Sequence, residues 1–226
     1  LGMGAGNNLG IKNVNKDFVL ILNPDVTLEK NSMDEIFIAL NEIDNFAIIA
    51  PISNKDKYPN YILKNGHNFD PVKPFKVKSV DGYAMLLNLK RLSKMNNFNF
   101  FDENFFLYLE NEDMCKRLSD NEEDIYIIPK SKIYHLGGKA VDQKYKEEIE
   151  HLRNWHWMWS KFYFNKKHYG YLIALSKVSK NLISAKIKFF YYLITFNNFK
   201  RKIYQMRLLG LISSMLGKNS YYRPKI

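Results

Sequence analysis

Short apolar runs alternate with amphipathic stretches from the start of the chain to residue 135. Each run is bounded by turn residues, a pattern typical of fully buried strands in a parallel sheet. Because such strands alternate with helical patterns, the sequence predicts an α/β fold with a mostly parallel, Rossmann-like sheet. The predicted strands are residues 17–22, 46–50, 76–80, 83–87, 124–128 and 131–135.

Helical patterns fill most of the intervals between these runs. Ser32 and Glu35 have the spacing of a capping box, which predicts a helix from Ser32 to about Glu42. The Gly/Asn-rich segment Gly2–Gly10 is expected to be a loop or a helix entry, and residues 53–75 an irregular excursion. Shorter helices are predicted at residues 8–14 and 89–95, and longer ones at about 142–164, 168–195 and 198–216.

This pattern predicts two parts: an α/β domain over residues 1–140 and a helical region over residues 141–226. An apolar content of 46% in 226 residues is enough for a real core. The single Cys115 cannot form an internal disulfide, which fits a reducing compartment. The sequence shows no signal peptide and no apolar run of the roughly 20 residues that a spanning helix needs. We therefore expect a cytoplasmic location.

Charge divides the chain unequally. Residues 151–226 contain fifteen Lys and Arg and no Asp or Glu, whereas residues 1–150 carry a net charge of −4. Such a basic region suits phospholipid, a phosphorylated lipid carrier or nucleic acid, although a solvated helical face has the same composition. Phe189–Phe196 is too short to span a membrane, but lysines and arginines flank it, which predicts a helix at the inner surface of the cell membrane. The acidic body and the lack of a known motif argue against nucleic acid.

The stretch Phe101–Leu118 places five carboxylates among aromatic residues. If its second half is helical, Glu110 and Asp113 lie on one face and Arg117 follows Asp113 by four residues. Burial of a carboxylate is costly, so one interpretation is a catalytic face. The other interpretation is an ordinary acidic helix start, which the helix dipole favours.

Two further polar residues end predicted strands. Asp25 follows the first strand in Asn23-Pro24-Asp25, at the edge where open α/β sheets bind ligands. One carboxylate there can hold a divalent cation, Mg²⁺ or Mn²⁺, that also takes phosphate oxygens, although the tripeptide could be a simple turn. His135 ends the last strand, before Gly137-Gly138, and could bind the cation or a diphosphate, or be structural.

Four motifs occur in order with suitable gaps: Gly4-Ala5-Gly6-Asn7-Asn8, Leu22-Asn23-Pro24-Asp25, the Phe101–Leu118 stretch and Tyr134-His135. Together they resemble the family-2 glycosyltransferases, especially the bacterial rhamnosyltransferase-like branch of surface polysaccharide synthesis. The resemblance covers roughly residues 1–140. It implies a GT-A fold and transfer, with inversion, of a sugar from a nucleotide sugar to a glycan or lipid-linked acceptor. It also implies that the first strand–helix units, roughly 60 residues that hold the base, are missing and leave a sheet edge exposed.

The resemblance also implies roles for single residues. Asp25 would be the second acid of an Asp-x-Asp-type metal motif, with Asn23 in the place of the first, and His135 would lie near the metal or diphosphate. Asp81-Gly82 matches the loop that contacts the acceptor and the donor sugar. The residues expected to bind substrate are Gly4, Asn7, Asn8, Asn23, Asp81, Gly82 and Arg117.

The chain departs from the family pattern at the head of the acidic helix. Many relatives have Glu-Asp there, with the Asp as general base, whereas this chain has Asn111, whose amide cannot usefully accept a proton. Either Glu110 or Asp113 acts instead, or the site is weak. We favour Glu110, because it precedes the helix and can point into the cleft, and we expect Asp113 to pair with Arg117. The alternatives to a transferase are an inactive or binding-only sugar-nucleotide domain, a basic nucleic-acid-binding protein and a hydrolase with paired carboxylates.

Overall fold

The computed structural model describes residues 2–53, 58–95, 98–136 and 143–223, and their contacts divide the chain into two units. The sheet unit comprises the described parts of residues 5–102 and 110–140. The helical unit comprises residues 2–4 and 103–109 together with the described part of residues 141–226. The two units are therefore not successive segments, because residues 103–109 leave the sheet unit and residue 110 returns to it.

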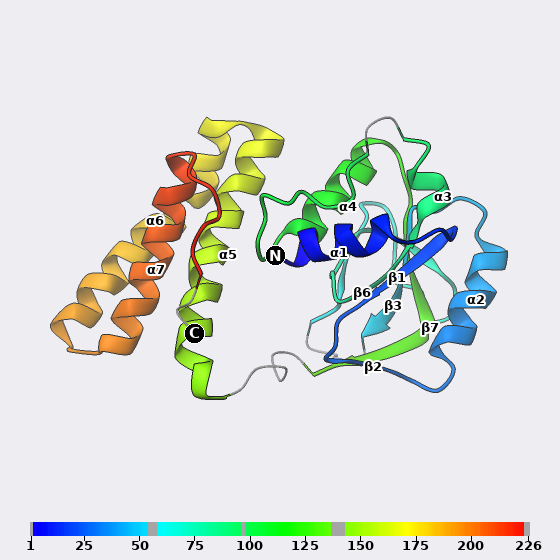
Figure 1. The fold of residues 1–226 in the computed structure, drawn as a ribbon, viewed down its shortest axis with the longest axis horizontal. Coiled ribbons are helices and arrows are strands. Elements are labelled where there is room, and N and C mark those ends of the chain that lie inside the picture. Colours follow the sequence, from blue (N-terminus) through cyan, green and yellow to red (C-terminus); the bar gives the residue numbers. More distant parts are fainter. Residues whose placement is uncertain (1, 54–57, 96–97, 137–142, 224–226) are drawn as a thin grey trace. The chain divides into compact units, whose positions relative to one another are not determined.

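The sheet unit is built on one mixed sheet (Figure 1). Its strand order is β1-β6-β3-β7-β5-β4, and β2 pairs with β7 outside this path. The strands are β1 (Phe18–Leu22), β2 (Val26–Leu28), β3 (Ile48–Ser53), β4 (Tyr61–Leu63), β5 (Phe75–Val80), β6 (Ala84–Asn88) and β7 (Ile125–His135).

The prediction of a mostly parallel sheet is only partly confirmed. Strands β3 and β7 pair in parallel, but the other described pairings are antiparallel. The difference arises at Asp81-Gly82. Strand β5 pairs antiparallel with β7, and β6 pairs antiparallel with β3, so β5 and β6 run in the same direction on opposite sides of the β3–β7 pair. Residues 81–83 therefore connect β5 on one side of the β3–β7 pair to β6 on the other. The direction in which a strand runs cannot be read from its apolar residues alone.

Other strand predictions need smaller corrections. Strand β1 was expected to be fully buried, but it is an edge strand that buries Ile21 and exposes Phe18 and Leu22. The two strands predicted after residue 124 form the single strand β7, whose register against β3 shifts after Pro51. Strands β2 and β4 were not predicted, because each is only three residues long.

The helices of the sheet unit are α1 (Met3–Lys12), which begins in residues 3–4 of the helical unit, α2 (Ser32–Glu42), α3 (Leu89–Leu92) and α4 (Glu110–Asp120). The Gly/Asn-rich start is thus mainly helix, because its glycines are followed by residues that can propagate one. The bounds of α2 are as predicted, but its capping box is wrong. The Ser32 hydroxyl bonds to the backbone of Lys132 in β7, and Asn31 occupies the N-cap without a side-chain bond.

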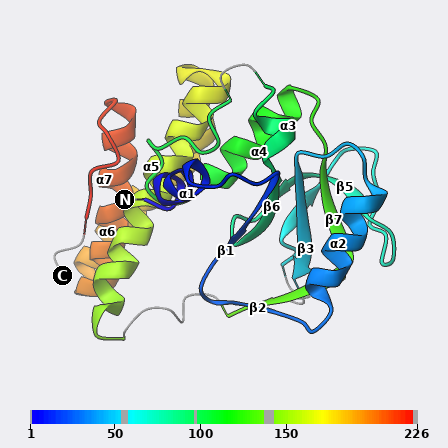
Figure 2. The ribbon, with the colours of Figure 1, turned by 45° about the vertical axis from the view of Figure 1, so that its right-hand side comes forward.

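Apolar residues cover both faces of the sheet. Ile36 and Ala39 of α2 pack on one face with Ile49, whereas Met114 and Leu118 of α4 pack on the other face in one cluster with Ile48. Neighbouring residues of β3 thus serve opposite faces, as the alternation of side chains along a strand requires. Figure 2 shows α2 on one side of the sheet, with α1 and α4 on the other.

The helical unit contains α5 (Lys146–Tyr169), α6 (Tyr171–Ile194) and α7 (Asn198–Met215), with a short 3-10 turn (Gln143–Tyr145) before α5. These helices confirm the three predicted ones to within a few residues. Helices α5 and α7 cross closely at Gly210, where an added Cβ would lie 2.1 Å from the Trp155 carbonyl oxygen. Among the described helices, none has both the length and the apolar content to cross a membrane.

Candidate active site

Asp25 and His135 lie together where β2 pairs with the end of β7. Val26 pairs with His135, and the backbone N–H of Leu136 donates to the Asp25 carbonyl at 3.0 Å. The side chains meet with 3.4 Å between Asp25 Oδ2 and His135 Nε2, and they are 13% and 23% exposed. The two residues that the sequence singles out as metal ligands, more than a hundred positions apart, are therefore neighbours with some access to solvent.

Tyr83 packs against the His135 side chain of this pair. Its ring stacks on the His135 imidazole with 4.1 Å between the ring centroids and 18° between the planes. The backbone N–H of Asn23 donates to the Tyr83 carbonyl at 2.9 Å, which ties the turn before Asp25 to the same place. Burial raises the pKa of the Tyr83 phenol to about 12, so the hydroxyl stays protonated at neutral pH. Sequence reasoning missed Tyr83, although it directly follows Asp81-Gly82.

Asp81 belongs to the same group of side chains. Burial raises the pKa of its carboxyl, and the charge of His135 acts in the opposite direction, so the two side chains are within electrostatic reach. The Asp81 N–H donates to the Asn60 carbonyl at 2.9 Å, and Gly82 is buried beside it. This corner, where the chain crosses the sheet, therefore supplies a second carboxyl near Asp25 and His135.

The first turn of α4 is attached to the corner. The Asn111 side-chain amide donates to the Val80 carbonyl at 2.8 Å. Burial raises the pKa of Glu112; a hydrogen bond from Ser79 lowers it and the charge of Asp81 raises it further. Asn111 thus joins the acidic helix to the end of β5. Sequence reasoning missed Glu112, since its partner Ser79 belongs to a different element.

Glu110 begins α4 and precedes Asn111, which is bonded to the corner. It is 1% exposed, and its Oε2 atom has no hydrogen-bond partner in the described part of the chain. Burial raises its pKa to about 7, which suits a group that must accept a proton at neutral pH. Tyr108 and Leu109, immediately before it, have φ values of 70° and 67°. Consecutive left-handed residues with large side chains are strained, and such strain gathers at functional sites.

Asp113 and Arg117 form the predicted ion pair, with 2.9 Å between Arg117 Nε and Asp113 Oδ2. The other guanidinium nitrogens of Arg117 donate to the carbonyls of Asn99 and Phe100. Arg117 is thus engaged with the chain itself, and its predicted role in binding substrate stays a prediction.

The predicted ligands from the first motif lie on α1. Asn8 is bonded in both directions to the backbone of Phe101, which holds the start of the acidic stretch. Gly4 is buried in the helix, and Asn7 is half-buried. Their expected contact with substrate stays a prediction.

The donor set at Asp25 and His135 fits a cation that is shared with a ligand. Within the residues that the structure describes, no group of three or more His, Cys, Asp or Glu side chains could hold a metal ion. Mg²⁺, however, is usually bound by one or two carboxylates together with substrate phosphates and water. One carboxylate and one imidazole, 3.4 Å apart, meet that requirement if a diphosphate supplies the remaining ligands.

A cavity of about 780 Å³ lies elsewhere in the sheet unit. Its lining includes Lys73, Lys76, Asp124 and Tyr126, at the beginning of β5 and β7, whereas His135 ends β7. The Lys76 ammonium is paired with Asp124 at 2.6 Å, so part of its charge is neutralised internally. We assign no role to this cavity.

No protein-family model matches the chain. The chain is similar to the low-salt glycan biosynthesis hexosyltransferase Agl10 of Haloferax volcanii, with 28% identity over 160 residues. The match covers 63% of this chain and 50% of the relative, so the chain spans about half the length of the curated relative it matches. Among solved structures, it is similar to the crystal structure of GalNAc-T7 with UDP, GalNAc and Mn²⁺, with a TM-score of 0.46 and 10% identity over 81% of this chain and 44% of that one. The sequence similarity supports the resemblance to glycosyltransferases.

Proposed function

We propose that the chain transfers a hexose from a nucleoside-diphosphate sugar to a hydroxyl of a glycan or lipid-linked acceptor, in the synthesis of a surface glycan. The similarity to a glycan biosynthesis hexosyltransferase supports this proposal. The observation that carries it is the Asp25–His135 pair, 3.4 Å apart, beside the half-buried carboxyl of Asp81. A cation-binding pair next to a further carboxyl suits a reaction in which a diphosphate departs and a hydroxyl loses its proton.

On the donor side, Asp25 and His135 would hold a divalent cation, Mg²⁺ or Mn²⁺. When bound, such a cation offsets the negative charge of a departing nucleoside diphosphate. Tyr83 fixes the plane of the His135 ring by stacking on it, and the Leu136 N–H holds the backbone of Asp25. Asp81 would accept hydrogen bonds from hydroxyls of the donor sugar.

On the acceptor side, Glu110 would act as the general base. Its unpartnered Oε2 atom takes the proton of the acceptor hydroxyl as the acceptor oxygen attacks the anomeric carbon. The bond from that carbon to the diphosphate oxygen breaks, and the diphosphate leaves with the electron pair. Inverting transfer needs a single base of this kind, whereas a hydrolase needs a pair of acids. Asp113, held by Arg117, keeps α4 in place.

The finer parts of the proposal rest on the motifs. These parts are a GT-A fold, membership of family 2, a rhamnosyl donor, a bacterial polysaccharide pathway, and a cytoplasmic location at the inner face of the cell membrane. The division into a catalytic domain up to residue 140 and a basic helical region after it also remains part of the proposal.

The direct test is product formation by the chain with a panel of nucleotide sugars and glycan or lipid-linked acceptors, with and without a chelator. We expect a transferred hexose, and we expect the chelator to abolish transfer. Glu110→Gln should lower turnover by about 10²- to 10⁴-fold, the usual contribution of a general base, without lowering the melting temperature. Asp120→Asn, at the exposed end of the same helix, is the matched control. Full transfer by Glu110→Gln, with none by Asp113→Asn, would show that the base is assigned to the wrong residue.

One observation favours a second candidate function, a domain that binds sugar nucleotides without turnover. Asn111 stands where the resemblance expects the base, and its amide is used in a hydrogen bond to the Val80 carbonyl. Calorimetry separates the two functions. Binding of a nucleotide sugar with no product from any acceptor would favour the binding domain.

A further inference from the structure

The second half of α6 exposes a continuous apolar face. Its large apolar side chains recur at intervals of three and four residues, so they lie on one side of the helix. Their exposed fractions run from 58% to 74%, and Phe196, in the turn to α7, is 88% exposed. We call this surface the apolar stripe; it consists of Ile183, Ile187, Phe190, Tyr191, Ile194 and Phe196.

The turn between α6 and α7 holds Phe196 in an unfavourable conformation. Its φ of 54° lies in the left-handed region, where glycine is the usual residue after a helix. A bulky side chain in this region costs free energy, and the exposed ring recovers little of it by packing within the chain. A phenylalanine at this position therefore makes physical sense if the ring is buried in something outside the chain.

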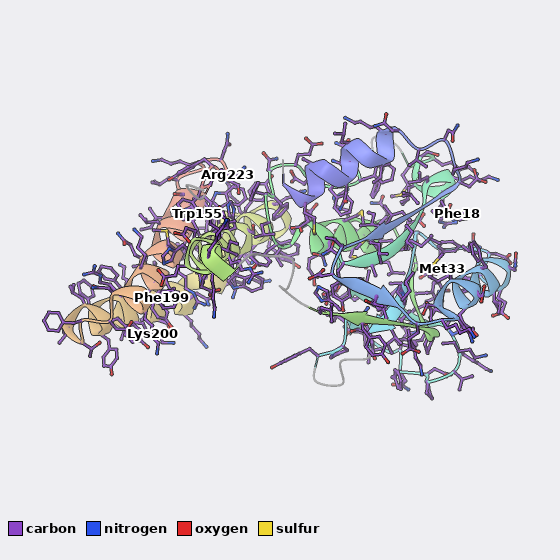
Figure 3. All side chains as sticks on the ribbon, turned by 60° about the horizontal axis from the view of Figure 1, so that its bottom comes forward. Phe18, Met33, Trp155, Phe199, Lys200 and Arg223 are labelled. Carbon is purple, nitrogen blue, oxygen red and sulfur yellow. The ribbon has the colours of Figure 1, made fainter. Side chains whose placement is uncertain are left out.

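Positive charge surrounds the stripe. Lys186 and Lys188 lie on α6, and Lys200, Arg201 and Lys202 lie near the start of α7. The Lys188 and Lys200 ammonium groups lie 5.4 Å and 5.3 Å from the ring centroids of Tyr204 and Tyr192. Figure 3 labels Phe199 and Lys200 beside the α6–α7 turn. Residues 151–226 contain no acid. Glu147, Glu148 and Glu150 of α5 lie within electrostatic reach of His151, as does Lys202, so they offset part of the positive charge near the start of α7.

We propose that the apolar stripe and the α6–α7 turn insert into the headgroup region of an anionic lipid bilayer. From Ile183 to Ile194 the stripe is about 16 Å long at 1.5 Å per residue, which suits a helix that lies along the interface. The side chains of the stripe enter the acyl boundary, and the five cations contact lipid phosphates. This inference rests on the peripheral membrane location proposed above, but it does not depend on sugar transfer.

The test is co-sedimentation of the whole chain with vesicles of phosphatidylcholine and phosphatidylglycerol in equal parts, and with phosphatidylcholine alone. We expect binding to the anionic vesicles that weakens as salt is added, and little binding to the neutral ones. Phe196→Gly should weaken binding about tenfold, because a buried ring is lost. The same variant should not lower the melting temperature, because glycine adopts the left-handed conformation without strain.

The matched pair of variants is Ile194→Gln and Leu172→Gln. The two side chains are 74% and 79% exposed and lie on the same helix, but Leu172 is at its opposite end. We expect only Ile194→Gln to weaken vesicle binding. No sedimentation with anionic vesicles at low salt would overturn the proposal, as would equal binding by all three variants and the parent chain.

A different partner would also be visible. If the chain is a dimer without lipid and Ile194→Gln makes it a monomer, the stripe binds a second copy and the membrane proposal is wrong. Transfer to a water-soluble acceptor, measured without lipid, reports on the proposed enzyme alone. A failure of vesicle binding with transfer intact therefore refutes only the inference about the stripe.

Discussion

The sheet unit and the helical unit depart from ordinary burial in opposite directions. The sheet unit buries two carboxyls, Glu110 and Asp113, at 1% and 0% exposure. The helical unit instead leaves Ile194 and Phe196 at 74% and 88% exposure. Burial of an acid costs free energy, and an exposed apolar patch lowers solubility. The proposed reaction would explain the buried acids of the sheet unit, and the proposed lipid partner would explain the exposed apolar residues of the helical unit.

The two buried carboxyls also differ from each other, although they are one helical turn apart. Asp113 is paired with Arg117, whereas Glu110 has an oxygen without a partner among the described residues. A paired buried acid contributes to the fold, and an unpaired one destabilises it when ionised. The contrast supports a structural role for Asp113 and the proposed chemical role for Glu110, and two measurements can break or sharpen it.

The largest expected effect on stability is that of Asp113→Ala. Removal of this carboxylate leaves the Arg117 guanidinium without its buried counter-ion, so the free energy of unfolding should fall by about 3–5 kcal/mol. Urea denaturation measures the change. The control is Asp120→Ala, which breaks the Lys116–Asp120 pair at the same i,i+4 spacing on the exposed side of α4 and should cost about 0.5 kcal/mol. Equal losses in the two variants would remove the structural distinction.

The next effect concerns pH. Burial raises the pKa of Glu110 from 4.5 to about 7 in the folded chain. Between these values the folded state binds more protons than the unfolded state, so the stability that Glu110 contributes is present below pH 4.5 and is lost as the pH rises to 7. The loss should reach about 3 kcal/mol, and Glu110→Gln should remove it. Urea denaturation from pH 4.5 to pH 8 measures the free energy of unfolding of the parent chain and of Glu110→Gln. The same dependence on pH in both proteins would contradict the assignment.

The smallest effect tests the packing of the helical unit. In Gly210→Ala the new methyl would lie 2.1 Å from the Trp155 carbonyl oxygen, a backbone atom that cannot move aside. Helices α5 and α7 must separate, and thermal unfolding should show a loss of about 1–3 kcal/mol. Gly6→Ala is the matched control, since an added Cβ there has no neighbour within 4 Å and the position is also helical. An unchanged melting temperature for Gly210→Ala would mean that α5 and α7 can move apart at this crossing without loss of stability.

The sequence predicts some elements well because their causes are local. The three long helices after residue 142 follow from a sustained pattern without turn residues, and their bounds agree with prediction to within a few positions. The limits of α2 were also predicted. Its capping was not, because the hydroxyl of Ser32 is used by Lys132, a hundred residues away. The hydrogen-bond partner of Ser32 is determined by the position of β7 in the sheet, and the spacing of nearby residues in the sequence carries no information about that position.

The candidate site shows the same division. Asp25 and His135 could be selected because each ends an apolar run, and the structure brings them to 3.4 Å. Tyr83 and Glu112 could not be selected, since their importance comes from contacts to His135 and Ser79 on other elements. Strand direction was predicted only in part, because a parallel and an antiparallel buried strand have similar composition.

Residues 103–109 have a consequence for how such a chain could be divided or recombined. The Phe105 ring packs against Trp159, and the Ser160 hydroxyl donates to the Leu107 carbonyl at 2.8 Å, so this loop belongs to the helical unit. A gene cut at codon 140 would strip the loop of these partners while leaving it attached directly to Glu110. An exchange of helical units between related chains would therefore have to carry the loop along, as an inserted segment inside the coding sequence of the sheet unit.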